Sequence, residues 1–176
     1  MEDAENGLPD LARTLIHEVW QRYQTTRKQV LEADRALSAL VRESEQARRL
    51  MTIPGVGEQV ATAIVASVEP RQFDSGRQLA AWIGLTPRQY TTGGVIRLGR
   101  ITKRGDKYLR MCLIHGARAV IANLRDKQDR TSCWLRELIA RRGYKRAIVS
   151  LAARNARLIW TLMMKQETYQ TMPVSG

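Results

Sequence analysis

Two adjacent hydroxyls on a glycine-rich loop are the residues of this chain whose spacing could do chemistry. The segment Tyr90-Thr91-Thr92-Gly93-Gly94 places Thr91 and Thr92 beside two glycines, which allow a tight turn. A strip of cations follows, against the single acid Asp106: Arg97, Arg100, Lys103, Arg104, Lys107 and Arg110. Hydroxyls beside dense positive charge indicate a site that meets a phosphate backbone. A turn with a solvated basic face is the alternative interpretation.

Positive charge is concentrated in the second part of the chain. The 176 residues carry a formal net charge of +12. Residues 1–50 contain 8 basic and 9 acidic side chains, whereas residues 51–176 contain 21 basic and 8 acidic ones, a net charge of +13. Such a one-sided positive field favours a polyanion through counterion release. Double-stranded DNA is therefore a predicted partner. An anionic membrane is the weaker alternative, because no uninterrupted apolar span stands out.

The sequence separates into an arm and a body, between an N-terminal tail (1–10) and a C-terminal tail (170–176). Residues 11–49 fit a heptad, and we expect one continuous coiled-coil helix there. One seam position holds Ile16, Tyr23, Val30, Leu37 and Ser44, and the other holds Ala12, Val19, Thr26, Ala33, Leu40 and Ala47. A helix of this length is too long for a small domain to cover, which predicts an intermolecular or intramolecular coiled coil. We expect a homo-oligomer that forms through it. A long amphipathic helix lying on its own domain is the alternative.

The body, residues 50–169, begins with a predicted helix-hairpin-helix over about residues 50–68. An apolar helix end is followed by Pro54-Gly55-Val56-Gly57 and then by a helix rich in small residues. Two glycines permit a tight turn and a close approach of a phosphate, which the N-terminus of the following helix attracts. Pro54, Gly55, Val56 and Gly57 are therefore candidate contacts to the DNA backbone, together with the cationic strip. A purely structural helical hairpin is the alternative.

The rest of the body is predicted to be helical, which makes the fold class mainly α. A short helix is expected within residues 73–87, capped by Asp74 or Ser75 and burying Trp82. Only residues 95–101 resemble a strand. Longer helices are expected over residues 107–123, 132–140 and 147–164, with Gly143 ending the middle one.

Cysteine and histidine usage argues against a metal site. Cys112 and Cys133 stand alone in apolar helical contexts, and His17 and His115 are far apart in the sequence. We predict buried, reduced thiols, no metal site and a cytoplasmic (nucleoid-associated) protein. The acidic N-terminus indicates no signal peptide. The sequence also contains no Walker lysine motif, no HExxH and no GxSxG.

Five motifs, in their order and spacing, resemble those of the C-terminal part of insertion-sequence transposases of the IS-one-ten type. Within that family the sequence resembles the IS-eleven-eleven subgroup most. The motifs are IPGVG, SGRQLAAWIGLTPRQ, TTGGVIRLGRITKRGDKYLR, LIHGARAVI and LAARNARLIWTLM, within a match from about Glu5 to about Tyr169. The resemblance implies DNA transposition and site-specific recombination, directed by a structured guide RNA. Family members resemble one another in having an N-terminal RuvC-like domain with an acidic metal-binding tetrad, then a coiled coil, then a transposase domain with a nucleophilic serine.

The resemblance also implies a mechanism, and two departures bear on it. The loop hydroxyl would attack a scissile phosphate, Arg97, Arg100, Lys103 and Arg104 would neutralise the charge, and Lys107 and Arg110 would follow the neighbouring backbone. The RuvC-like domain has no counterpart in this sequence, so we expect no cofactor here, and Mg²⁺ only together with that missing domain.

The second departure is the nucleophile itself. The family's serine lies in a Ser-Ser-Gly-Gly or Ser-Thr-Gly-Gly loop, which aligns with residues 91–94, so that Thr91 is the preferred position and Thr92 its alternative. The extra methyl of threonine crowds an in-line approach to phosphorus and restricts χ1. A catalytically inactive DNA- or RNA-binding remnant is therefore the alternative to an active recombinase. A helix-hairpin-helix repair module is disfavoured by the resemblance beyond residue 70.

Overall fold

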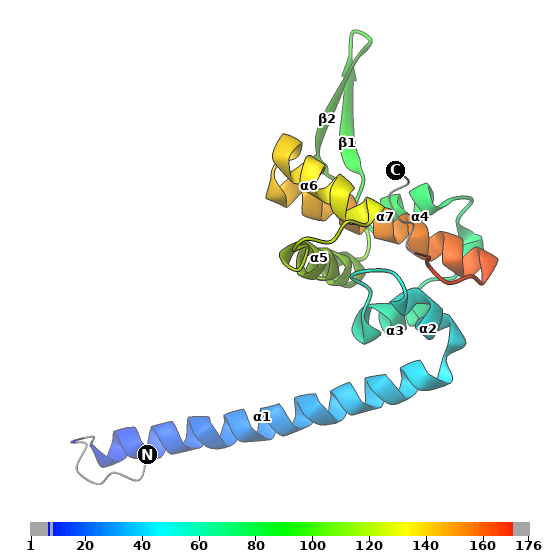
Figure 1. Cartoon of the computed structure of the whole chain (residues 1–176). Coiled ribbons are helices and arrows are strands. Elements are labelled where there is room, and N and C mark those ends of the chain that lie inside the picture. The colour runs from blue at the N-terminus through cyan, green and yellow to red at the C-terminus, as the bar shows by residue number, and fades with distance from the viewer. Residues whose placement is uncertain (1–6, 8, 171–176) are drawn as a thin grey trace. The chain divides into compact units, whose positions relative to one another are not determined.

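The chain separates into two units, residues 1–39 and residues 40–176, in the computed structural model, which describes residue 7 and residues 9–170. The described residues form seven α-helices, one 3-10 turn and two strands. Figure 1 shows that helices dominate both units. The predicted mainly α-helical fold is confirmed.

Helix α1, Asp10–Glu43, accounts for the first unit and continues into the first residues of the second. Its 34 residues extend over about 51 Å at 1.5 Å per residue. Apolar side chains at both predicted seam positions are exposed along it, among them Ile16 at 40%, Tyr23 at 52% and Val19 at 65%. Among the described residues of the first unit nothing covers this apolar stripe, and the coiled coil that would cover it stays a prediction.

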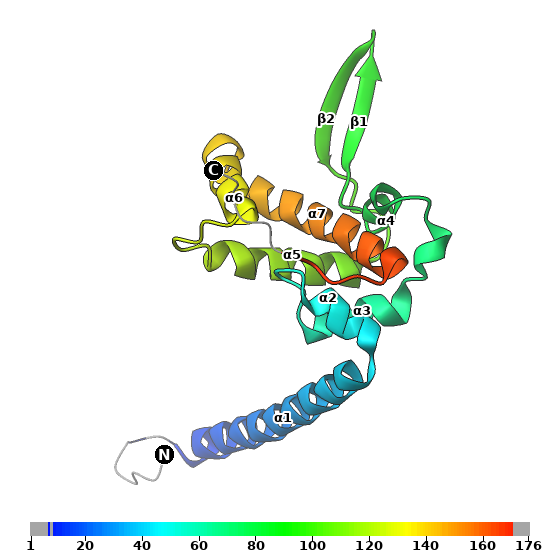
Figure 2. The same cartoon turned by 45° about the vertical axis from the view of Figure 1, so that its right-hand side comes forward.

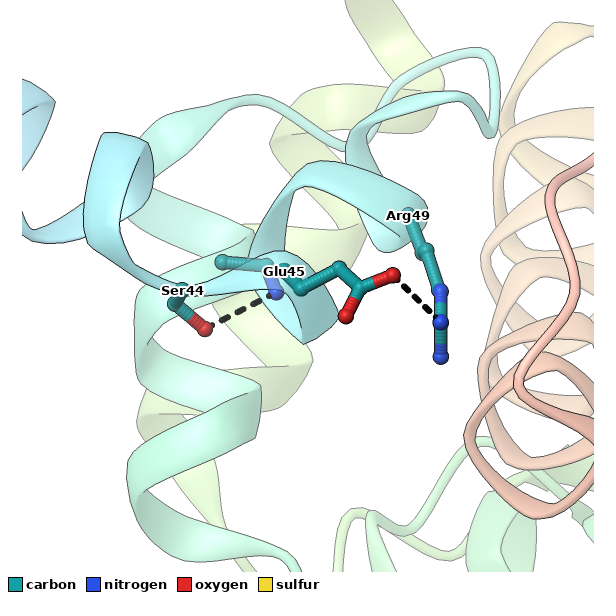
Figure 3. A network of polar contacts seen from close by, with 4 residues as sticks. Ser44, Glu45 and Arg49 are labelled. Atoms are coloured by element: carbon teal, nitrogen blue, oxygen red, sulfur yellow. Dashed lines mark hydrogen bonds and ion pairs between the residues drawn. The ribbon is translucent and has the colours of Figure 1, made fainter.

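Ser44 separates α1 from the next helix, α2, Glu45–Met51. The Oγ of Ser44 accepts a hydrogen bond from the backbone N–H of Ala47 at 3.1 Å, which caps the new helix. Figure 3 shows this cap and also the ion pair between Glu45 and Arg49 of α2. The Arg49 Nη2 atom lies 2.5 Å from Glu45 Oε1. The prediction of one continuous helix over residues 11–49 is wrong at this point. Ala47, placed in the heptad seam, is instead fully buried in the core of the second unit.

Helix α7, Tyr144–Lys165, is the centre of the second unit. It contacts α2, α4 (Gly76–Trp82), α5 (Lys107–Ala122), α6 (Arg130–Arg142) and the 3-10 turn η1 (Pro70–Gln72). Helix α3, Glu58–Ser67, packs on α2 and α5. Figure 2 shows α7 running alongside α5. Three alanines of α7 are completely buried and allow this close packing: Ala147, Ala152 and Ala156.

Polar side chains cap the starts of three further helices in the second unit, α4, α5 and α6. Ser75 caps α4 and Asp106 caps α5, each by accepting a bond from a first-turn N–H, so Ser75 is the correct one of the two predicted caps. Asp129 caps α6 through the N–H groups of Thr131 and Ser132. The Ser132 hydroxyl donates to the same carboxylate and lowers the pKa of Asp129. Because of this cap, α6 begins earlier than the apolar pattern predicts. Helix α7 also begins earlier than predicted, directly after Gly143, which caps it without a side-chain hydrogen bond.

Trp82 is less buried than predicted. Its side chain is 41% exposed, because Leu79, Ala80 and Ile83 take the inward side of this segment. The indole instead meets the ring of Phe73 edge-on, with 5.7 Å between the ring centroids.

The two strands form an antiparallel hairpin, β1 (Pro87–Thr92) and β2 (Val95–Ile101). The predicted strand over residues 95–101 is confirmed, whereas β1 is an additional strand. Every residue from 87 to 100 is exposed, so the hairpin is held by its cross-strand hydrogen bonds and by its root. Figures 1 and 2 show it projecting from the helices.

Candidate nucleic-acid interface

The tip of the hairpin is a two-residue turn made of Gly93 and Gly94. Thr92 pairs with Val95, and both glycines have positive φ, 59° and 79°. A tight hairpin turn whose twist matches its strands requires this conformation at both positions, which explains the glycines. A side chain at either glycine would meet nothing within 4 Å, so the space around the tip is open. The turn therefore presents the preceding threonines to solvent.

Thr92 lies on the same face of the hairpin as Arg97. Strand residues alternate between faces, so Thr92 shares its face with Tyr90, whose cross-strand partner is Arg97. The ring of Tyr90 lies over Gly99, where an added Cβ would come within 3.0 Å of it. This face thus combines the Thr92 hydroxyl at the tip with the Arg97 guanidinium, which belongs to the next pair on the same face.

Thr91 lies on the opposite face, among different neighbours. It pairs with Ile96 and is followed down the strand by the Gln89–Leu98 pair. Gln89 Nε2 donates a hydrogen bond to Thr91 Oγ1 at 3.2 Å. Ile96 and Leu98 are both exposed on this face, whereas on the other face the exposed Val95 opposite Thr92 is followed along β2 by Arg97. The two candidate hydroxyls therefore differ in charge environment, although they are adjacent in sequence.

The root of the hairpin is fixed by close backbone packing. A Cβ added at Gly84 would lie 2.0 Å from the carbonyl oxygen of Arg104, and one at Gly105 would lie 1.7 Å from that of Trp82. The N–H of Lys103, whose φ is 56°, donates to the Gly84 carbonyl at 3.1 Å. Only glycine leaves room for these contacts. The direction in which the hairpin leaves the helices is therefore set at its base.

Five cations of the predicted strip surround the hairpin and are exposed. We call them the hairpin cations: Arg97, Arg100, Lys103, Arg104 and Lys107. Within the described part of the chain, none of the five forms an ion pair. Arg88 is a further exposed cation at the base of β1, where it donates to the Thr102 carbonyl at 3.4 Å. It stands next to Pro87 in the sequence, and its position beside the strip becomes evident only from the strand pairing.

Arg110 differs from the rest of the strip. It is partly buried, and its Nη1 donates to the carbonyl oxygens of Ile83 at 2.8 Å and Asp106 at 3.3 Å. These bonds tie the first turn of α5 to the end of α4. Arg110 therefore serves the hairpin root, and its guanidinium is already engaged by protein carbonyls.

The turn between α2 and α3 is packed against the protein on one side. A Cβ added at Gly55 would lie 2.8 Å from the carbonyl oxygen of Gly116 in α5, and one added at Gly116 would lie 1.8 Å from that of Gly55. Val56 is buried, and the Pro54 carbonyl accepts a hydrogen bond from Asn155 Nδ2 at 2.9 Å. The close approach that Gly55 permits is thus made to another helix.

Pro54 and Gly57 are the exposed members of this turn, and Gly57 also has open space around it. Gly57 is the N-cap of α3 without a side-chain hydrogen bond, and a side chain there would meet nothing within 4 Å. The two helices and the turn exist as predicted, while their use as a DNA-binding helix-hairpin-helix stays a prediction. Such a contact would be made through Pro54 and Gly57, the two exposed residues of the turn.

The thiols and the acidic side chains show no sign of a metal centre. Across the described residues no three His, Cys, Asp or Glu side chains are grouped in a way that could hold a metal ion. Cys112 is buried, which raises the pKa of its thiol, whereas Cys133 is only partly buried, contrary to the prediction. In the same residues no helix has the length and apolar character that a membrane crossing needs. The geometry defines a basic, mainly α-helical domain with two hydroxyls on an exposed hairpin.

Comparison with known proteins assigns this domain to a family. Residues 47–132 match the family described as Transposase IS116/IS110/IS902. The chain is 43% identical over 164 residues to a Pseudomonas aeruginosa protein named "Probable family 20 transposase", covering 93% of the chain and 48% of that protein. It is 47% identical over 135 residues to the transposase for insertion sequence element IS1111A of Coxiella burnetii, covering 76% of the chain and 37% of the relative.

A third relative agrees with these two. The transposase for insertion sequence element IS1328 of Yersinia enterocolitica is 33% identical over 159 residues, which cover 90% of the chain and 48% of the relative. The chain belongs to the IS116/IS110/IS902 family of transposases. It spans about half the length, or less, of these curated relatives.

Proposed function

We propose that this chain acts in DNA transposition, by binding duplex DNA around the hairpin and presenting a hairpin hydroxyl to a scissile phosphate. Membership of a transposase family supports the process. The observation that carries the proposal is the hairpin itself, which is exposed from residue 87 to residue 100, has a closely packed root and is surrounded by five exposed cations. Ile101 at the end of β2 packs against the core, and the polar and basic side chains of residues 87–100 are exposed and available to a ligand.

The proposed chemistry is transfer of a phosphoryl group from DNA to the protein and back. The threonine Oγ1 attacks phosphorus, its proton passes to a base, and the bond from phosphorus to a deoxyribose oxygen breaks, with that oxygen gaining a proton. The resulting protein–DNA ester conserves the phosphodiester energy, so a second deoxyribose hydroxyl can displace the protein again. Both strand cleavage and strand exchange follow from one hydroxyl.

Geometry favours Thr92 for this role over the sequence-based preference for Thr91. A phosphate approaching Thr92 meets Arg97 on the same face, where a guanidinium can bind two of its oxygens and stabilise the developing charge. A phosphate approaching Thr91 meets Ile96 and Leu98 instead. We therefore place the nucleophile at Thr92, with Thr91 as the alternative that the same experiment examines.

Three partners complete the proposal, and each has different support. A second copy of the chain is supported by the exposed apolar stripe of α1. A guide RNA, and a RuvC-like domain that brings Mg²⁺, rest on the family resemblance alone. The described residues offer no group that fits a metal ion, so no step proposed for this chain passes through one.

A hairpin-excised variant tests the binding part of this function. Deleting residues 89–98 and joining Arg88 to Gly99 removes exposed side chains and leaves the packed root in place. We expect an unchanged helix content and melting temperature by circular dichroism. By fluorescence anisotropy the affinity for duplex DNA should fall, and its salt dependence should be shallower by about 0.9 in slope, because Arg97 is the one hairpin cation within the deleted residues. Unchanged duplex affinity in a correctly folded variant would rule out the hairpin as the DNA contact.

A binding protein without catalytic activity is the second candidate function. The observation that favours it is threonine at both positions where the family has its serine and the neighbouring residue. Such a protein would bind DNA through the same cations and form no covalent adduct. Its signature is full binding by the natural chain and by the Thr91→Ser and Thr92→Ser variants, with no ester in any of them.

A further inference from the structure

A second basic surface lies at the turn between α6 and α7. We call it the α6–α7 corner, and it consists of Arg141, Arg142, Gly143, Tyr144, Lys145 and Arg146, all of them exposed. The sequence has no acidic residue between Glu137 and Glu167. Within the described residues no carboxylate pairs with any of the four cations of the corner. Like charges this close repel one another, and a bound polyanion relieves that repulsion.

Tyr144 distinguishes this corner from an ordinary solvated charge cluster. Its side chain is 46% exposed, whereas Trp134, Trp160 and Tyr169 are packed against the hydrophobic core. No ring contact or hydrogen bond engages Tyr144 within the described residues. An aromatic ring exposed among arginines offers a stacking surface to a planar base.

The corner and the hairpin lie on the same side of the second unit. In Figures 1 and 2 the turn from α6 into α7 lies at the upper end of the helical part, which is also the side from which the hairpin projects. Both belong to the second unit, and α6 packs on α7. A nucleic acid opened at the hairpin would therefore have a second cationic surface on the side where its strands separate.

We propose that the α6–α7 corner binds an unpaired DNA strand, with Arg141, Arg142, Lys145 and Arg146 on its phosphates and Tyr144 stacked on one of its bases. The inference rests on the proposed function, because strand cleavage and exchange at the hairpin create unpaired strands. An unpaired strand fits better than a duplex, since the bases of a duplex are already stacked on one another and have no free face for the ring. The corner therefore holds the strand that leaves its partner.

Substitution of Tyr144 in the full chain tests the stacking contact. Tyr144→Ala should weaken binding of a labelled oligothymidine roughly tenfold, since one base stacked on an aromatic ring is worth about that factor or more. Tyr144→Phe keeps the ring and should keep the affinity. Binding of a duplex should be the same in both variants. An equal loss on single strand and duplex, or no loss on the single strand, would overturn the proposal.

Charge removal gives an independent test with a matched control. For single-stranded DNA, log affinity falls with log salt. Replacing the four corner cations by glutamine should make this negative slope less steep by about 0.7 for each phosphate that is no longer neutralised. The control replaces four exposed cations of α1 and should leave that slope unchanged: Arg22, Arg27, Lys28 and Arg35. Equal effects of the two variants would show that net charge alone is acting.

Two further arms separate this inference from the proposed function. The hairpin-excised variant should bind duplex more weakly, because it lacks Arg97 and the tip, and should retain Tyr144-dependent binding of single strands. If that variant behaves so while the corner variants bind single strands like the natural chain, the corner proposal alone fails. Tighter Tyr144-dependent binding of an RNA strand of the same sequence would overturn DNA as the occupant.

Discussion

Removing the charges of Arg97 and Arg100 should make duplex binding less dependent on salt. The size of the change follows from the number of exposed hairpin cations, of which these are two. Each phosphate neutralised by a cation contributes about −0.9 to the slope of log affinity against log salt. Five hairpin cations at five phosphates therefore contribute a slope of about −4.5, and the double variant Arg97→Gln/Arg100→Gln should retain about −2.7 of it. Between 50 and 200 mM salt this part of the affinity falls roughly 500-fold in the natural chain and roughly 40-fold in the variant.

The assay is fluorescence anisotropy of a labelled duplex, repeated over a series of salt concentrations. Arg110→Gln provides the control, because the Arg110 guanidinium is occupied by the carbonyls of Ile83 and Asp106. We expect it to leave the slope unchanged and to lower the free energy of unfolding by about 1–3 kcal/mol, the usual effect of leaving buried polar groups without partners. A double variant with the natural slope, or an Arg110 variant with a reduced one, would refute the assignment of the hairpin cations.

Three further substitutions test other contacts. Gly116→Ala places a methyl 1.8 Å from the Gly55 carbonyl, so the melting temperature should fall by an amount equivalent to about 1–3 kcal/mol, and a wild-type melt would contradict the packing of this turn on α5. Asn155→Leu removes the donor to the Pro54 carbonyl and should lower the free energy of unfolding, measured in a denaturant titration, by about 1–3 kcal/mol. A smaller change would contradict a structural role for this hydrogen bond. Leu37→Asp should reduce the solution mass measured by light scattering, because a carboxylate in a coiled-coil seam is unfavourable. If the mass stays the same, the heptad has no role in assembly.

The helices could be predicted from the sequence because their apolar residues recur at helical spacing, but two features had no such signal. The segment 88–92 is polar and exposed on both faces, so no alternation marks it, and it becomes a strand only by pairing with β2. The break at Ser44 carries no glycine or proline, and it arises because the hydroxyl caps the helix that follows. The sequence therefore predicts a helix or strand only where one of its faces is buried, because burial is what makes apolar residues recur at a regular spacing.

The candidate site could be predicted in composition and not in geometry. The sequence alone shows the Gly93-Gly94 turn and the cations that follow it, because glycine and cationic residues are recognised by type. The engagement of Arg110 by two carbonyls and the contact of Gly55 with Gly116 depend on segments far apart in the chain, which no local pattern encodes. Thr91 and Thr92 point to opposite faces because they are neighbours in a strand, but that Thr92 shares its face with Arg97 follows from the register of the two strands, which only the structure provides.

Trapping of a covalent protein–DNA adduct tests the central claim most directly. The full chain, its Thr92→Ser and Thr91→Ser variants and a Thr92→Ala variant are incubated with labelled duplex, a guide RNA and a RuvC-like domain supplied in trans with Mg²⁺, and adducts are separated by denaturing electrophoresis. We predict the strongest adduct for Thr92→Ser, because serine removes the crowding methyl on the face that Arg97 shares, and none for Thr92→Ala, with salt-dependent binding intact. An adduct from Thr91→Ser alone would move the nucleophile to the other face. Absence of an adduct from both serine variants, with DNA bound, would contradict a hairpin nucleophile and leave a DNA-binding protein.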